Sequence, residues 1–138
     1  MGRFNVEIEI VNNQDLMAVR LGVLDPAKVR RMTISGLVDT GATRLVLPAK
    51  AVKFLGLPVK KKRLRVRYAD GRRAMRSEAE EVRLYLLGRD GHFNAVVEPG
   101  RESALIGAIV LEDLDFLVDS ARARLVPRDP DFVVSEIE

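Results

Sequence analysis

The sequence predicts an all-β domain, folded as a barrel or a sandwich, with one or two short helices. Apolar residues alternate with polar ones in several short segments, which is the period-two pattern of strands that bury one face. Turn dipeptides and prolines separate these segments at short intervals, as in hairpins. The chain of 138 residues contains no linker or low-complexity stretch, so residues 1–138 are predicted to form a single domain.

The first part of the chain is predicted to be a strand hairpin. Residues 5–10 alternate between apolar and polar types, and residues 12–15 are polar turn formers. Residues 17–23 alternate again, and Pro26 ends this strand because proline lacks the N–H that a sheet ladder needs. The pattern therefore predicts an N-terminal hairpin of about residues 1–28.

The remaining elements follow from the same signals. Pro48 suits the first turn of a helix and Gly56 suits its end, which predicts a helix over 48–54. Asp70–Gly71 predicts a tight hairpin turn. Further strands are predicted over residues 29–38, 45–47, 64–68, 82–86, 93–97, 116–118 and 124–126, a second helix over 109–114, turns at 89–91 and 119–121, and a C-terminal tail of about 128–138 with a strand over 132–137.

The composition excludes several classes of chemistry. The chain has no cysteine, which rules out disulfides, Cys-ligated zinc, iron–sulfur clusters and thiol catalysis. Its single histidine, His92, rules out a multi-His metal site within one chain and argues against a serine triad. We therefore expect neither a metal nor a cofactor. The formal net charge is only +3, so we expect no nucleic-acid partner.

The sequence predicts a cytoplasmic protein without a membrane partner. The longest apolar stretch covers residues 104–111, which is far shorter than a membrane-spanning helix. The first residues lead directly into alternating charges, so no secretory signal is expected.

The segment Asp39–Thr40–Gly41 is the clearest candidate for a functional loop. Asp39 directly follows the apolar end of a predicted strand, so the sheet is expected to hold its backbone rigid. Gly41 permits a tight turn and lets a backbone N–H approach the carboxylate. The Thr40 hydroxyl can donate and accept hydrogen bonds, which suits it to bracing one copy of the loop against another. By itself, such a tripeptide also fits an ordinary turn.

In its context, this segment resembles the active-site loop of the retroviral-type (retropepsin-like) aspartic proteases. Two apolar residues precede Asp39, and Ala42 and a short apolar strand follow the tripeptide. Residues 68–72 stand where that family carries its flap hairpin, and residues 104–107 resemble the apolar-apolar-Gly segment beside the active-site loop. The resemblance covers about residues 29–127. The predicted N-terminal hairpin is longer than a minimal member needs, and the segment before the flap is more basic.

The resemblance implies a closed acid-protease barrel and an aspartic endopeptidase. Because the chain holds one copy of the motif, it implies a homodimer in which two Asp39 carboxylates activate a water molecule, with Thr40 and Gly41 shaping the loop. The expected partner is a peptide or unfolded protein with apolar side chains. The positions implied in substrate binding are Ala42, Tyr68, Ala69, Asp70, Gly71, Leu105, Ile106 and Gly107, with Val46 or Leu47 completing the wall.

Two features leave alternatives open. Asp119–Ser120–Ala121 echoes the first motif, but alanine stands where a second active-site loop would need glycine, so a hairpin turn is favoured there. Residues 60–67 are rich in lysine and arginine, which fits a solvated strand face or a patch for an acidic partner. The alternative functions are a retropepsin-fold binding or assembly module with little proteolysis, and a nucleic-acid binder that uses the basic patch.

Overall fold

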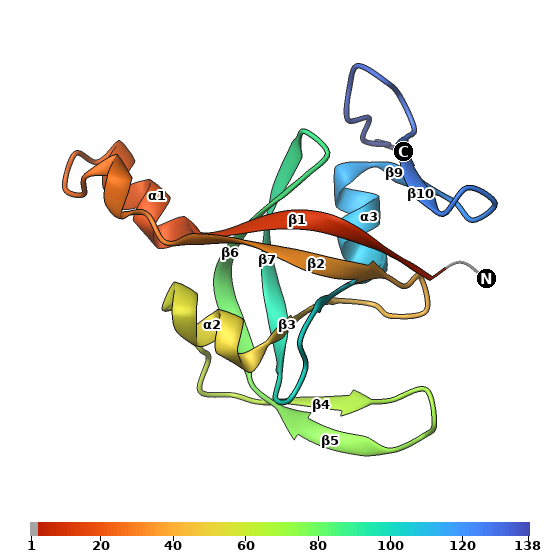
Figure 1. The fold of residues 1–138 in the computed structure, drawn as a ribbon, viewed down its shortest axis with the longest axis horizontal. Helices are drawn as coiled ribbons and strands as arrows, with labels where there is room; N and C mark the ends of the chain where they lie inside the picture. The colour runs from red at the N-terminus through yellow and green to blue at the C-terminus, as the bar shows by residue number, and fades with distance from the viewer. Residues whose placement is uncertain (1–2) are drawn as a thin grey trace.

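Strands dominate the computed structural model of the protein, which describes residues 3–138 (Figure 1). In chain order the elements are β1 (Phe4–Asn12), α1 (Asn13–Arg20), the 3-10 turn η1 (Pro26–Lys28), β2 (Arg31–Val38), β3 (Leu45–Pro48), α2 (Ala49–Leu55), β4 (Leu64–Arg67), β5 (Arg73–Arg76), β6 (Glu78–Leu86), β7 (Arg89–Glu98), β8 (Ala104–Ile106), α3 (Ala108–Leu114), β9 (Phe116–Asp119) and β10 (Arg124–Pro127).

Six of these strands close into a barrel, so the predicted all-β barrel is confirmed. The strand order is β1-β2-β8-β3-β7-β6, and β6 pairs back with β1. Two neighbouring pairs, β2–β8 and β3–β7, are parallel. The hairpins β4–β5 and β9–β10 form separate two-stranded sheets. Closure of the barrel leaves its strands no free edge at which another chain could pair.

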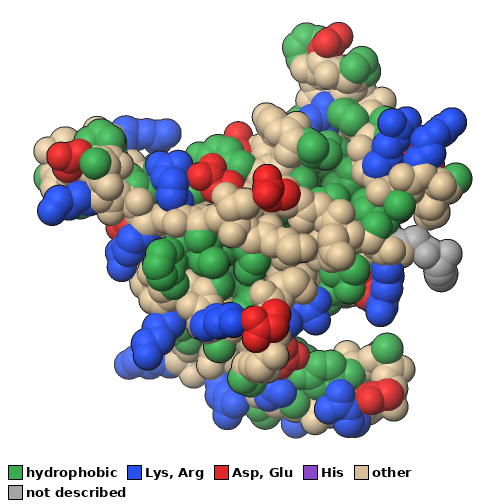
Figure 2. Space-filling view, in the orientation of Figure 1, with side chains coloured by type: hydrophobic (Ala, Val, Ile, Leu, Met, Phe, Trp, Pro, Cys, Tyr) green, Lys and Arg blue, Asp and Glu red, His purple; other side chains and the backbone are tan. Residues whose placement is uncertain are grey.

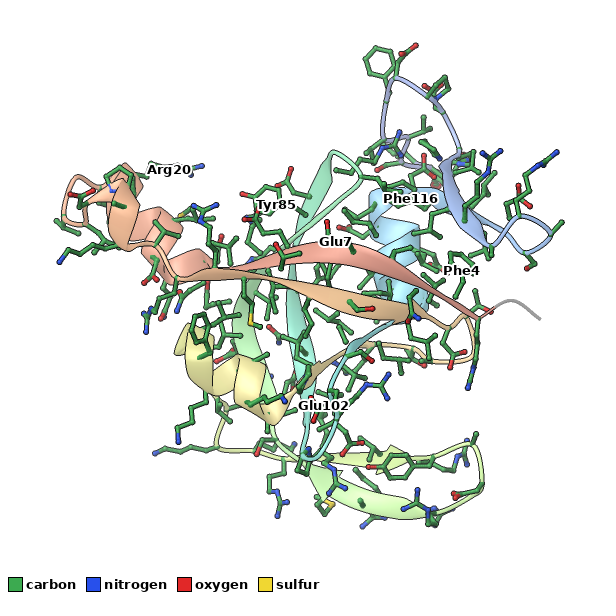
Figure 3. All side chains as sticks on the ribbon, viewed as in Figure 1. Phe4, Glu7, Arg20, Tyr85, Glu102 and Phe116 are labelled. Atoms are coloured by element: carbon green, nitrogen blue, oxygen red, sulfur yellow. The ribbon has the colours of Figure 1, made fainter. Side chains whose placement is uncertain are left out.

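The alternating sequence pattern determines which side chains fill the barrel. On β1, Ile8 and Ile10 are buried, whereas Glu7 and Glu9 lie on the other face of the strand. Phe4 on β1 and Phe116 on β9, both labelled in Figure 3, belong to the same apolar core although they lie near opposite ends of the sequence. The core therefore ties the chain ends to the centre of the barrel.

The prediction of a second strand over residues 17–23 in the N-terminal hairpin is wrong, because residues 13–20 form the helix α1. The Asn12 side chain accepts a hydrogen bond from the Asp15 N–H at 3.1 Å, which caps the helix, and donates to the Leu55 carbonyl oxygen at 2.8 Å. The alternating apolar residues bury no face, since Leu21 and Val23 are 77% and 76% exposed. Residues 1 and 2 of the predicted hairpin lie outside the described residues.

With α1, residues 3–138 contain three α-helices where one or two were expected. Helix α1 projects from the barrel, and Arg20 at its end lies far from the core (Figures 1 and 3). The helix ending at Gly56 and the one before Asp115 lie where the sequence predicted them. No helix within residues 3–138 is long and apolar enough to cross a lipid bilayer.

The turn between β6 and β7 lies earlier than the predicted turn at 89–91. Leu87 and Gly88 form it, with φ angles of 49° and 84°. Two consecutive positive φ values match the twist of a two-residue hairpin, and glycine adopts such an angle without strain. Gly91 instead lies within β7 opposite Leu84.

The tail of residues 128–138 does not contain the predicted strand. The Asp115 carboxylate holds it instead, accepting hydrogen bonds from Arg128 Nε at 2.7 Å and from the Val134 N–H at 2.9 Å. Arg89 also donates to the carbonyl oxygens of Asp129 and Phe132. A strand needs a neighbouring edge, and the closed barrel offers none within this chain.

The ion pair between Asp15 and Arg30 fixes α1 to the start of β2. Arg30 donates from Nε and Nη2 to the two Asp15 carboxylate oxygens, each at 2.9 Å, and its backbone N–H also donates to Oδ2 at 2.9 Å. The Asp15 side chain is only 11% exposed. The hydrogen bonds from Arg30 outweigh the effect of burial and lower the pKa of Asp15 below its ordinary value.

We predict that Asp15→Asn lowers the free energy of unfolding at pH 7 by about 1–2 kcal/mol, since Arg30 is half exposed and partly screened. Because the pKa of Asp15 is lowered in the folded state, this stabilisation is present at neutral pH and is lost as the pH falls below about 5. Urea unfolding of both chains across this range measures the difference. Asp131→Asn, at an exposed position, is the control. A pH-independent difference between the chains would contradict the prediction.

Candidate active site

Asp39 lies where β2 leaves the barrel. The last residue of β2, Val38, is fully buried and pairs with Ile106 of β8 in parallel register. The Asp39 N–H then donates to the Ile106 carbonyl oxygen at 3.1 Å. The backbone on which the carboxylate sits is therefore held by the barrel itself.

Two donors hold the carboxylate of Asp39. The Gly41 N–H donates to Oδ1 at 2.9 Å, which is the close approach expected from the sequence. Arg3 Nη2 donates to Oδ2 at 3.0 Å. The Asp39 side chain is 17% exposed, whereas that of Arg3 is 63% exposed. The carboxylate therefore lies near the surface of the barrel, and the arginine that pairs with it is largely in solvent. The neighbouring Thr40 is exposed, and its hydroxyl has no hydrogen-bond partner within residues 3–138.

The loop after Asp39 packs against the chain at Gly107, with no room for a side chain between them. A Cβ atom on Gly107 would lie 2.5 Å from the Arg44 carbonyl oxygen and 2.8 Å from that of Ala42. Directly after the glycine, the N–H groups of Ala108 and Ile109 donate to the carbonyl oxygens of Ala42 and Thr43, both at 2.9 Å. The start of α3 thus braces the loop, so the two segments that the sequence singled out lie side by side.

A cavity of about 470 Å³ lies between this loop and the β4–β5 hairpin. Figure 2 shows a hollow between that hairpin and the barrel. We call residues 64–76 the flap hairpin. The residues around the cavity come from the loop, the flap hairpin and the neighbouring barrel strands: Gly41, Ala42, Thr43, Arg44, Val46, Leu64, Arg65, Val66, Arg67, Tyr68, Val96, Glu98, Arg101 and Leu105.

Glu98, at the end of β7, connects the flap hairpin to the barrel. Its carboxylate accepts a hydrogen bond from the Tyr68 hydroxyl at 2.6 Å and one from Arg76 Nε at 2.5 Å. The hydrogen bond to Glu98, together with burial, raises the pKa of Tyr68 above its ordinary value. The Arg72 guanidinium lies over the Tyr68 ring, 4.6 Å from its centroid. These contacts hold the inner face of the hairpin over the cavity.

Glu78 connects the base of the flap hairpin to the loop that follows Asp39. Its buried carboxylate accepts hydrogen bonds from Asn94 at 2.9 Å and Lys60 at 3.4 Å, and Arg44 lies 3.5 Å away. Burial favours the neutral acid, but these donors and charges outweigh it and lower the pKa of Glu78 below its ordinary value. Glu78 therefore links the active-site loop, through Arg44, to the base of the flap hairpin, through Lys60.

The sequence-predicted substrate positions separate into two groups. Ala42, Tyr68 and Leu105 line the cavity. The flap tip, Ala69–Gly71, is exposed and does not line it. Ile106 is fully buried in the barrel core, and Gly107 packs against the loop.

The substrate-wall role expected for Ile106 does not fit its position. Side chains alternate along β8, so Leu105 faces the cavity while Ile106 faces the core. By the same alternation, Val46 lines the cavity and Leu47 is buried.

Sequence reasoning missed three charged residues of the cavity, namely Arg44, Glu98 and Arg101. Glu98 directly follows the predicted strand of residues 93–97, and no sequence pattern indicates a function for it. Arg44 lies between the Asp39–Thr40–Gly41 motif and the next predicted strand, where its spacing does not indicate a functional position. Only the folded chain brings these residues together.

The second Asp motif lies apart from this arrangement. Asp119 ends β9 and faces the turn to β10, where its carboxylate accepts the Arg122 N–H at 3.2 Å. Burial favours its neutral form, but hydrogen bonds from Arg122 and the charge of Arg124 outweigh this effect and lower the pKa of Asp119. This placement matches the hairpin turn favoured from the sequence. Within residues 3–138, no group of three or more His, Cys, Asp or Glu side chains could hold a metal ion.

Comparison with known proteins agrees with this geometry. A search among curated proteins finds no match. A family model described as aspartyl protease matches residues 25–110, which is more than half of the chain. The matched range contains the Asp39 loop, the flap hairpin and Gly107. The Asp39 loop, the glycine that braces it and the flap hairpin therefore lie in the part of the sequence that the family shares, and the chain belongs to this retropepsin-like aspartyl protease family.

Proposed function

We propose that the protein is an aspartic endopeptidase that acts as a homodimer, with one Asp39 from each subunit. The observation that supports this most strongly is the position of Asp39. Its carboxylate stands at the end of a rigid barrel strand, on a loop braced by the Gly107 segment, beside a cavity covered by the flap hairpin. A cytoplasmic location stays a prediction from the sequence.

The chemistry requires two carboxylates that share one proton. The ionised carboxylate removes a proton from a water molecule, which attacks the carbonyl carbon of the peptide bond. The protonated carboxyl donates its proton to the carbonyl oxygen. Each chain supplies one Asp39 on a loop of this kind, whereas Asp119 is occupied by its own turn. A symmetric pair of chains supplies both groups at one site.

Two features of the single chain suit this pairing. The Thr40 hydroxyl is exposed next to Asp39 and is available to a partner loop. The Arg3–Asp39 ion pair is mostly exposed on its arginine side, and pairs of this kind contribute little to stability. A partner carboxylate can therefore replace Arg3 at Oδ2 at small energetic cost.

The flap hairpin is suited to cover an extended peptide. Leu64, Val66 and Tyr68 share the inner face of the hairpin and are half buried, so they present apolar surface to the cavity. Closure over the substrate excludes water from the reacting carboxylates, apart from the attacking molecule.

We predict that Asp39→Asn abolishes cleavage of unfolded casein while leaving the fold intact, because the amide has nearly the shape of the carboxyl but cannot serve as the base. Asp119→Asn is the matched control. It should keep nearly full activity and lose at most a few tenths of a kcal/mol of stability. Equal loss of activity in both variants would instead indicate a pair formed within one chain. An active-site inhibitor of the pepstatin type should block the unaltered chain.

Mixing the two chains tests the shared site. If every active site needs two Asp39 carboxylates, a ninefold excess of Asp39→Asn chains should reduce the activity of a fixed amount of unaltered protein about tenfold after subunit exchange. Diluting the unaltered protein alone should lower its specific activity, together with the dimer fraction in sedimentation experiments. Activity that is unaffected by both treatments would rule out the homodimeric mechanism.

The dependence of kcat/KM on pH should be bell-shaped. Loss of the ionised carboxylate lowers activity on the acid side, and loss of the shared proton lowers it on the alkaline side. Initial rates with one peptide substrate across the pH range, with circular dichroism to confirm folding, measure the profile. Full activity far into the alkaline range with an unchanged fold would contradict a dyad that needs one proton.

A further inference from the structure

The cavity beside Asp39 combines apolar walls with an excess of positive charge. Its apolar walls come mainly from Val46, Val66, Val96 and Leu105. The charged residues along it are Arg44, Arg65, Arg67, Arg101 and Glu98, so arginines outnumber the single carboxylate. Such a lining attracts a ligand that carries negative charge.

The carboxylate of Glu98 does not balance these arginines, because it is already engaged. Both of its oxygens are occupied, one by the Tyr68 hydroxyl and one by Arg76 Nε. Arg76 lies on β5 of the flap hairpin and does not line the cavity. With Glu98 matched to Arg76, and Arg44 within 3.5 Å of the Glu78 carboxylate, the charges of Arg65, Arg67 and Arg101 remain.

Arg101 is the arginine that the fold holds most firmly at the cavity. The guanidinium donates from Nε to the Ser103 carbonyl oxygen at 2.7 Å and from Nη2 to that of Ala104 at 3.5 Å. Both acceptors lie just before Leu105, which forms the cavity wall. The guanidinium is therefore oriented before any ligand arrives, which reduces the entropy lost on binding.

Arg101 has no carboxylate partner within residues 3–138. The neighbouring Glu102 pairs with Lys50, at 2.5 Å, and does not neutralise it. Figure 3 labels Glu102, which lies on the turn between β7 and β8. A half-buried cation, positioned by neutral carbonyl groups, keeps its full charge for a ligand.

The other three arginines of the cavity are held less firmly than Arg101 or lie at the rim. Arg44 is 44% exposed and only 3.5 Å from Glu78, whose oxygens also accept from Asn94 and Lys60. Its guanidinium can therefore turn toward a ligand. Arg65 and Arg67 alternate with the inward side chains of β4, so their side chains lie on the outer face of the flap hairpin and add charge at the rim.

We propose that this cavity selects substrates with an acidic side chain, glutamate or aspartate, bound by Arg101 and placed beside an apolar residue that packs on Val46 and Leu105. The inference rests on the proposed peptidase function and names its substrate class. It revises the purely apolar preference expected from the sequence. An arginine–carboxylate hydrogen bond is charge-assisted and directional, so the neutral amide of glutamine, although similar in shape, loses most of it.

The test is a scan of labelled octapeptides in which one glutamate occupies each position of an alanine–valine sequence, each with a glutamine twin. Binding to the Asp39→Asn chain is measured by fluorescence anisotropy, so that cleavage does not interfere. At one or more positions the glutamate peptide should bind at least about tenfold more tightly than its twin. Arg101→Gln in the same chain should reduce this ratio to within about twofold.

Arg73→Gln is the matched control, because it removes one positive charge from the outer face of the same flap hairpin without altering the cavity. It should leave the glutamate preference unchanged. An equal loss of the glutamate preference in Arg101→Gln and Arg73→Gln would show a general charge effect and overturn the assignment to Arg101. The absence of any glutamate preference at every position, including the absence of measurable binding, would also overturn it.

A second measurement separates this inference from the proposed function. The same peptide pairs are offered to the unaltered chain, and kcat/KM is compared between the twins. Cleavage without discrimination would retain the peptidase and reject the acidic selectivity. Glutamate-selective binding without cleavage would retain the cavity and reject the peptidase. Should Asp39→Asn alter assembly, peptides with reduced, non-cleavable bonds allow the binding scan on the unaltered chain.

Discussion

The passage of the active-site loop against Gly107 is the constraint on which the rest of the structure depends. A side chain at this position would collide with the carbonyl oxygens of Ala42 and Arg44. Because glycine stands there, the loop can accept hydrogen bonds from Ala108 and Ile109 at the start of α3. The same braced loop carries the Gly41 N–H that donates to the Asp39 carboxylate and forms one wall of the neighbouring cavity.

Two carboxylates connect the flap hairpin and the active-site loop to the barrel. Glu98 connects β7 to Tyr68 and Arg76 of the flap hairpin. Glu78 connects the hairpin base to the strand beyond the active-site loop, through Lys60 and Arg44. Each carboxylate is matched by donors, which offsets the cost of its burial. The hairpin is therefore anchored at its base and inner face, while its tip at Ala69–Gly71 stays exposed.

The sequence predicted most of the barrel because alternation and turn chemistry are local properties. Residues that alternate, such as those from Val6 to Ile10, fix which face of a strand is buried, and Asp70–Gly71 fixes a hairpin. Alternation does not indicate a strand at residues 17–23, because the Asn12 cap and the Asp15–Arg30 ion pair favour a helix over residues 13–20. It is also misleading at 132–137, where hydrogen bonds from Arg89 and to the Asp115 carboxylate hold the tail outside any sheet.

The sequence by itself determined the barrel class, the position of Asp39 at the end of a strand, and the family resemblance, because these depend on residues close together in the chain. Only the tertiary structure decided that Leu105 faces the cavity while Ile106 fills the core, and that Arg44, Glu98 and Arg101 surround one space. These residues come from different elements, and no local pattern records their distances. Barrel closure brings them together, and with them the charge that distinguishes this cavity.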